Sequence, residues 1–198
     1  VKSFLKQQLN TEAVDAYYEL FLHFSSDSKA VTKSEEEGKV QLTSMKDSVK
    51  ILGICKKINK QLNREQKVVV LVRLYELVNA DGKFTDQRMA IINTVAEVFN
   101  LDRKEVEAIE AFNIYTDASK VDFSDILIVN DKAETLENAI HLSTGKLDGS
   151  IFILKVKSAN LYFMRYLGAQ DIFLNGLLVN TSRIYLFSKG SFVKLPVG

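Results

Sequence analysis

Two histidines and one cysteine are the residues with which soft-metal or nucleophilic chemistry would have to begin in this sequence. His23, His141 and Cys55 lie far apart along the chain and lack the paired spacing of a zinc site. A nucleophile needs a base within hydrogen-bond reach, and neither histidine belongs to a motif such as Gly-x-Ser-x-Gly. Cys55 ends the apolar run 51–55, where a buried cysteine acts as a small hydrophobic side chain. We therefore expect structural roles for all three and no catalytic residues.

Phosphate chemistry is also missing from the sequence. The segment Ser143-Thr-Gly-Lys146 comes closest to the loop Gly-x-x-x-x-Gly-Lys-Ser/Thr that cradles nucleotide phosphates. It lacks both the first glycine and the hydroxyl residue that follows the lysine. We therefore predict that this chain is not an enzyme.

The overall composition indicates a globular protein without a dominant charge. The 198 residues are 46% hydrophobic and 26% charged, which is enough apolar material for two small cored domains. Lys and Arg (26) nearly balance Asp and Glu (25), so we expect no nucleic-acid partner. The longest apolar runs, 68–72 and 151–154, fall far short of the about 20 residues of a membrane span. With no signal-peptide pattern, these features predict a cytoplasmic protein.

Residues 1–116 carry apolar side chains at helical spacing, and capping patterns divide them into short-looped helices. A polar stretch without periodicity, 25–38, follows the first helix. The expected helices run from Val14 to Phe24, from Met45 to Leu62, from Arg64 to Asn79 behind the capping pair Asn63 and Gln66, onward from Thr85, and onward from the capping box of Asp102 and Glu105. These features predict an all-helical bundle.

The periodicity changes to two in the last third of the chain, which predicts strands. In a strand the side chains of Phe152, Leu154 and Val156 would face one way and those of Ile151, Ile153, Lys155 and Lys157 the other. Further along, Leu161 and Phe163 alternate with Tyr162, Met164 and Tyr166. Asn175-Gly176 between two apolar runs is a hairpin signal. Short strands at such spacing predict a small all-β sandwich or barrel. We therefore predict an α+β fold with a helical domain at 1–116, a linker at 117–125 and a β-domain at 126–198.

One segment of the helical part carries a family resemblance. Leu74-Tyr-Glu-Leu-Val-Asn-Ala-Asp81-Gly-Lys-Phe-Thr-Asp86 resembles the TerB-like (tellurite-resistance B) family, and Tyr17-Tyr-Glu-Leu20 before Asp27 weakly echoes its start. That resemblance implies an all-helical fold whose acidic helix-junction loops can hold Ca²⁺ or Mg²⁺, with Asp27, Asp81 and Asp86 as ligands. Arg88 replaces the glutamate usual after the loop. Alternatively, Asp81 begins a turn and Asp86 a helix, where the dipole favours an acidic residue.

The β-part carries a second resemblance. Asn175-Gly-Leu-Leu-Val-Asn180, followed by Ile184-Tyr-Leu-Phe-Ser-Lys-Gly190, resembles the closing strands of a forkhead-associated (FHA) β-sandwich. The arginine and the Ser-His pair with which that family binds phosphothreonine do not precede Asn175. We therefore predict no phosphopeptide-binding residues.

The order of the two resemblances is similar to the N-terminal region of a bacterial ABC-transporter ATP-binding protein of a type known chiefly from Bacteroidetes. The absence of Met at position 1 and the end at Pro196-Val-Gly198 predict a piece of a longer protein. The resemblance implies a non-catalytic regulatory or interaction region of a transport ATPase. Its partners would be another protein or its own downstream ATPase and membrane domains, with peripheral contact at the cytoplasmic face of the inner membrane. The alternative is a free-standing TerB-like stress protein that responds to divalent metal.

Overall fold

The computed structural model describes residues 49, 52–53, 55–57, 59–80, 85–117, 123–132, 139–145 and 147–195. Contacts divide the chain into two compact units, one of Val1–Leu71 with Lys83–Leu101 and one of Val72–Gly82 with Asp102–Gly198. The expected first helix and the 25–38 loop lie outside the described residues. The domain bounds expected from the sequence stay predictions.

The first unit is helical throughout its described elements, and its helices begin where the capping patterns predict. The described residues between 49 and 61 are helical, and α4 (Arg64–Ala80) follows after a break at Leu62 and Asn63. The Gln66 N–H donates to Asn63 Oδ1 over 2.9 Å, while the Asn63 N–H donates to Gln66 Oε1 over 3.0 Å. This reciprocal pair confirms the predicted capping box.

Helix α5 (Asp86–Val98) begins at the predicted cap, since Thr85 Oγ1 accepts the N–H of Arg88. The helix is followed by Asn100 in a left-handed conformation (φ 52°), the backbone region that asparagine tolerates better than most residues. The core of this unit is apolar, and its buried side chains include Cys55, Val68, Val70, Leu71, Ile92, Val95 and Phe99.

The second unit combines the end of α4, helix α6 (Arg103–Ile114) and all the described strands. Asp102 caps α6, and its Oδ1 accepts the N–H groups of Lys104 and Glu105. The predicted cap is therefore confirmed at this helix too.

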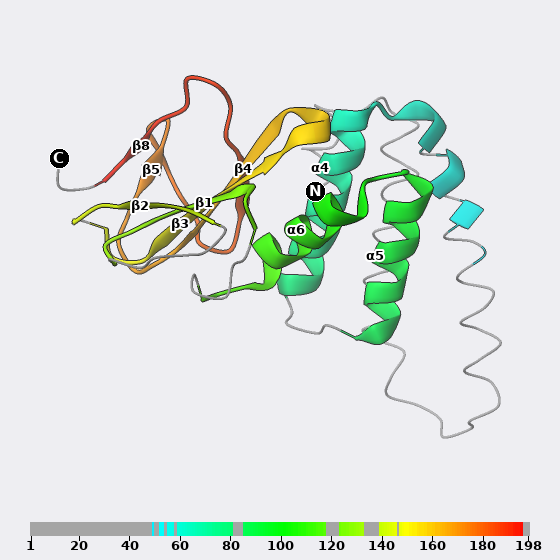
Figure 1. The fold of residues 1–198 in the computed structure, drawn as a ribbon, viewed down its shortest axis with the longest axis horizontal. Coiled ribbons are helices and arrows are strands. Elements are labelled where there is room, and N and C mark those ends of the chain that lie inside the picture. The colour runs from blue at the N-terminus through cyan, green and yellow to red at the C-terminus, as the bar shows by residue number, and fades with distance from the viewer. Residues whose placement is uncertain are drawn as a thin grey trace. The chain divides into compact units, whose positions relative to one another are not determined.

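Two sheets form the β-part of the second unit (Figure 1). The five-stranded sheet has the order β2-β1-β3-β4-β7, with β1 and β2 parallel and the other neighbours antiparallel. Its strands are β1 (Ile126–Asn130), β2 (Ile140–Ser143), β3 (Ser150–Val156), β4 (Leu161–Leu167) and β7 (Ile184–Leu186). The three-stranded sheet has the order β6-β5-β8, built from β5 (Phe173–Leu174), β6 (Leu177–Leu178) and β8 (Val193–Lys194).

The predicted hairpin is confirmed, because β5 pairs with β6 across Asn175 and Gly176. Both turn residues have positive φ, 52° and 82°, as the tight two-residue turn of an Asn-Gly hairpin requires. A short 3₁₀ helix, Lys157–Ala159, joins β3 to β4 and ends at Asn160 in the left-handed region. Residues that tolerate positive φ thus determine where these strands end.

The central strands β3 and β4 of the five-stranded sheet are covered on both faces. One face packs against the three-stranded sheet through a buried cluster of Leu147, Ile151, Met164, Tyr166, Ile172, Leu174 and Val179. On β3 the residues that alternate with Ile151 are Phe152, Leu154 and Val156, all buried, and β3 contacts α6. The predicted α+β class, helices followed by packed sheets, is confirmed.

Candidate interaction site

The structure places only one of the three aspartates that the TerB resemblance implies as metal ligands. Asp86 is exposed at the first position of α5, while Asp27 and Asp81 lie outside the described residues. Among the residues that are described, no three His, Cys, Asp or Glu side chains lie together as a metal site would require. Ligation by the three aspartates stays a prediction.

The structure describes two of the three residues considered as nucleophiles or soft metal ligands, Cys55 and His141. Cys55 is fully buried, and burial raises the pKa of its thiol to about 11, so it is protonated at neutral pH. The His141 Nε2 lies 2.7 Å from Oδ1 of the buried Asn130, whose Nδ2 donates to Ser150 Oγ over 3.3 Å. The ring is therefore bonded to the amide side chain of a buried asparagine. His23 lies outside the described residues.

The most unusual side chain of the second unit is Arg165, which is only 4% exposed although it lies in β4. It donates through Nη1 to the carbonyl of Asn113 and through Nη2 to the carbonyl of Tyr115. Both carbonyls lie at the C-terminal end of α6, where the helix dipole favours a cation. Arg165 thereby caps α6 from the sheet.

Aromatic rings complete the surroundings of this guanidinium. Its Cζ lies 5.8 Å from the ring centroid of Phe112 and 5.4 Å from that of Phe152, distances at which cations and aromatic faces attract. Burial lowers the pKa of Arg165 to about 10, which still leaves a full positive charge at neutral pH. The charge of Arg165 is therefore held by helix carbonyls and aromatic rings.

The end of α4 contacts the same helix terminus, because Asn79 on α4 bonds Asn113 on α6. The carbonyl of Asn113 accepts a second hydrogen bond, from Asn79 Nδ2 over 2.8 Å. The buried Asn113 side chain turns back along its own helix and donates to the Ile109 carbonyl over 2.7 Å. One carbonyl thus joins α4, α6 and β4.

A second polar contact joins α4 to the edge strand β7. Glu76 Oε1 accepts the N–H of Ile184 over 2.7 Å, and Arg73 Nη1 donates to the Ile184 carbonyl over 2.9 Å. Arg73 and Glu76 also form an ion pair of 2.6 Å with each other. The two side chains satisfy both backbone groups of one edge residue, which would otherwise be open to pairing.

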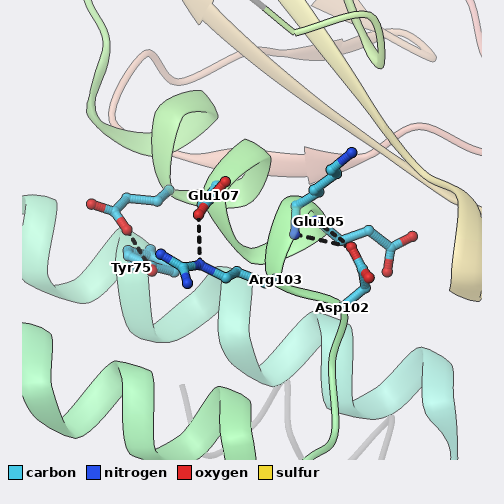
Figure 2. Close-up of polar contacts among 7 residues, drawn as sticks. Tyr75, Asp102, Arg103, Glu105 and Glu107 are labelled. Atoms are coloured by element: carbon cyan, nitrogen blue, oxygen red, sulfur yellow. Dashed lines mark hydrogen bonds and ion pairs between the residues drawn. The ribbon is translucent and has the colours of Figure 1, made fainter.

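Further polar contacts run along α6 (Figure 2). The Tyr75 hydroxyl donates to Glu110 Oε2 over 3.1 Å, and Glu105 Oε1 accepts the N–H of Ser158 over 2.8 Å. Burial, together with the charge and hydrogen bond of Glu110, raises the pKa of Tyr75 above its usual range. Arg103 and Glu107 pair over 3.0 Å in solvent, where such a pair adds little stability.

Three charged side chains of the second unit bind the backbone of neighbouring elements. Arg165 donates to the carbonyls of Asn113 and Tyr115, and Arg73 and Glu76 bond the backbone of Ile184 as well as each other. The sequence alone assigned no role to any of these three residues. The available signal was a single arginine within the otherwise apolar and aromatic stretch 161–167.

A groove opens at the other end of the β4 and β7 pair. It has a volume of about 490 Å³. Its lining residues are Asn160, Leu161, Tyr162, Leu186, Phe187, Ser188, Lys189, Gly190 and Ser191. All of these lining residues belong to the second unit.

Comparison with known proteins identifies a family for the N-terminal part of the chain. The family model described as tellurite resistance protein TerB matches residues 4–111, which is more than half of the chain. No curated protein and no solved structure matches the chain. Within the described ranges, no helix combines the length and apolar character that a bilayer crossing requires.

Proposed function

The chain belongs to the tellurite resistance protein TerB family, and we propose that it is a non-catalytic regulatory or interaction region of an ABC-type transport ATPase, acting at the cytoplasmic face of the membrane. The ATPase and membrane domains would be supplied by downstream sequence. In this proposal residues 126–198 form an FHA-like β-domain that presents a surface to a partner or to those domains.

The observation that supports this function best is the use of polar side chains in the second unit. Arg165 fixes the end of α6, and Arg73 with Glu76 fixes α4 to Ile184. Charge-assisted hydrogen bonds of this kind hold the helices and strands of the second unit in one arrangement. A surface that is already in its binding shape loses less entropy when a partner binds. A catalytic site would instead aim its charged groups at a pocket.

The test is the size and location of the native polypeptide. An antibody raised against this chain is used for immunoblots of soluble and membrane fractions from the source cells, with a deletion strain as the control for specificity. We expect a membrane-associated band far larger than the 22.3 kDa of this chain. A soluble band of about that size would overturn the proposal.

The family match also favours a second candidate, a free-standing module that responds to divalent metal. The matched range, 4–111, contains Asp27, Asp81 and Asp86 together. A ligand that binds only the folded state stabilises it, by about 2.7 kcal/mol at a hundredfold excess over the dissociation constant. We expect millimolar Ca²⁺ or Mg²⁺ to raise the melting temperature if this candidate is correct.

Matched variants decide the origin of such a shift. Asp86→Asn removes one proposed ligand, whereas Asp171→Asn removes an exposed carboxylate of the second unit. Loss of the shift in the first variant only would support the aspartate site. An unchanged melting temperature in the unmodified chain would exclude a metal-responsive role at these concentrations.

A further inference from the structure

The edge strand β7 presents its backbone groups in two directions. The N–H of Phe187 donates to the Tyr162 carbonyl over 2.8 Å, and Tyr185 lies opposite Met164 in the register. In an antiparallel pair alternate residues bond the neighbouring strand, so Tyr185 and Phe187 face β4. The N–H and C=O groups of Ile184 and Leu186 must then point away from β4, toward the open edge.

These two outward positions differ in what covers them. Ile184 is bonded by Arg73 and Glu76, which agrees with the direction derived from the register. Leu186 lines the groove instead, and no described residue hydrogen-bonds its outward N–H or C=O. An edge with such free groups is a template on which another extended chain can pair.

The groove around Leu186 has an apolar wall and a cationic end. Leu161, Tyr162 and Phe187 are half-buried and offer apolar surface next to the free backbone groups. Lys189 is exposed in the turn 188–191, and Lys155 Nζ lies 5.8 Å from the ring centroid of Tyr162. Among the described residues that line the groove there is no carboxylate, so its charge is positive.

We propose that this groove binds an extended acidic segment of a partner protein, which adds a strand at Leu186 and places a carboxylate beside Lys189. Main-chain hydrogen bonds at the edge supply affinity, and the apolar wall accepts alternate side chains of the added strand. The positive end selects acidic over basic segments by charge complementarity. The pairing is short, because Arg73 and Glu76 already occupy Ile184. This inference concerns this chain's own surface and does not depend on the transporter context.

The test measures peptide binding to the full chain by fluorescence anisotropy. The probe is a labelled, acetylated peptide of alternating valine and aspartate or glutamate, and its matched control carries asparagine and glutamine in place of the acids. We expect at least tenfold tighter binding of the acidic peptide, with affinity that falls as salt is added. Equal affinity for the two peptides would overturn the proposal.

Variants assign the binding to the groove. Lys189→Glu reverses an exposed charge and should weaken binding at least tenfold, whereas Lys104→Glu, an exposed lysine on α6, should leave it within twofold. Leu186→Pro removes the outward N–H without touching the β4 ladder and should abolish binding, while Leu186→Ala keeps that N–H and should retain most of it. Should Leu186→Pro fail to fold, Lys189→Glu and the two peptides still decide.

Other occupants would give distinct results. Binding of a phosphorylated serine peptide but not of the acidic one would overturn the proposal in favour of phosphate recognition. Concentration-dependent dimerisation in sedimentation that Lys189→Glu removes, without peptide binding, would overturn it in favour of self-association. Neither result would alter the outcome of the immunoblot that tests the proposed function.

Discussion

The two faces of the five-stranded sheet are closed in different ways. The face toward the three-stranded sheet is an apolar cluster that includes Ile151, Met164 and Tyr166, in which the Tyr166 hydroxyl reaches the Asp148 carbonyl over 2.6 Å. The opposite face includes Phe152 and a buried cation, Arg165, which bonds the carbonyl end of α6. Apolar packing largely suffices for the first face, whereas the second depends on a polar contact with one helix end.

The two kinds of contact differ in how narrowly they fix the position of the layer that covers the sheet. Apolar side chains fill space but accept small shifts of a neighbouring layer. A guanidinium that spans two carbonyls fixes position and direction, because its donors have a rigid planar geometry. We therefore expect α6 to hold one defined place on the sheet and to be sensitive to the loss of a single residue.

The largest effect should come from Arg165→Ala. This variant removes two charge-assisted hydrogen bonds and leaves a space between the rings of Phe112 and Phe152, so we expect a loss of at least about 3 kcal/mol in unfolding free energy. Arg165→Lys keeps the charge but cannot span both carbonyls, and it should restore only part of the loss. Urea denaturation followed by circular dichroism measures both variants.

The control for this series is Arg183→Ala, because that side chain is exposed in a loop. We expect it to change the unfolding free energy by less than about 0.5 kcal/mol. If Arg165→Ala were equally mild, α6 would be held by apolar contacts alone and the two faces would not differ in kind.

The next largest effect should come from Gly168→Ala, which disturbs the face that packs against the three-stranded sheet. A Cβ at this position would collide with both the Tyr166 hydroxyl and the Asp148 carbonyl. The tyrosine and the backbone would have to move apart, at a cost of about 2 kcal/mol. Thermal denaturation measures the change, and Gly145→Ala, where nothing lies within 4 Å of the new Cβ, is the matched control. If Gly168→Ala changed the melting temperature as little as the control does, the side chains of this face would adjust to the added methyl group without a cost in stability.

The two faces also differ in how far the sequence could predict them. Alternation along β3 and β4 predicts strands, and the caps at Asn63, Thr85 and Asp102 predict helix starts, because these patterns depend on neighbours in the chain. The role of Arg165 depends on residues some 50 positions away, Asn113 and Tyr115. Such a contact exists only once α6 lies on the sheet, so no local pattern reports it.

The same limit applies to Glu105 and to the edge of β7. Glu105 was predicted as the partner of Asp102 in a capping box, and Asp102 does accept its N–H, but Glu105 Oε1 accepts the N–H of Ser158. Arg73 and Glu76 resemble an ordinary helical ion pair in the sequence, yet they also satisfy the backbone of Ile184, more than 100 positions away. Local chemistry predicts the elements, and the tertiary arrangement assigns the remaining polar atoms.

A smaller effect should appear at high pH and should show whether α6 is held by Arg165 alone. The pKa of Tyr75 is raised by burial and by Glu110, so the folded state keeps the phenol protonated above the ordinary value of 10.0 at which the unfolded chain ionises. Its contribution is therefore complete below pH 10 and is lost as the pH rises further. From pH 8 to 11 we expect the unmodified chain to lose about 1 kcal/mol more than Tyr75→Phe in urea denaturation. Parallel pH profiles would mean that Tyr75 does not link α4 to α6.

The smallest effect should come from Tyr166→Phe, which tests how polar the apolar face is. The variant keeps the ring within the cluster and removes only the hydrogen bond to the Asp148 carbonyl, a loss of about 1 kcal/mol. Because burial, Asp148 and Asp171 raise the pKa of this phenol while the Gln170 backbone opposes them, the hydroxyl is a neutral donor at pH 7. The contrast with Arg165→Ala is then a difference between one neutral bond at the rim of a core and a buried cation that joins two layers. A loss from Tyr166→Phe as large as that from Arg165→Ala, measured under the same conditions, would show that both faces depend on polar contacts to the same degree.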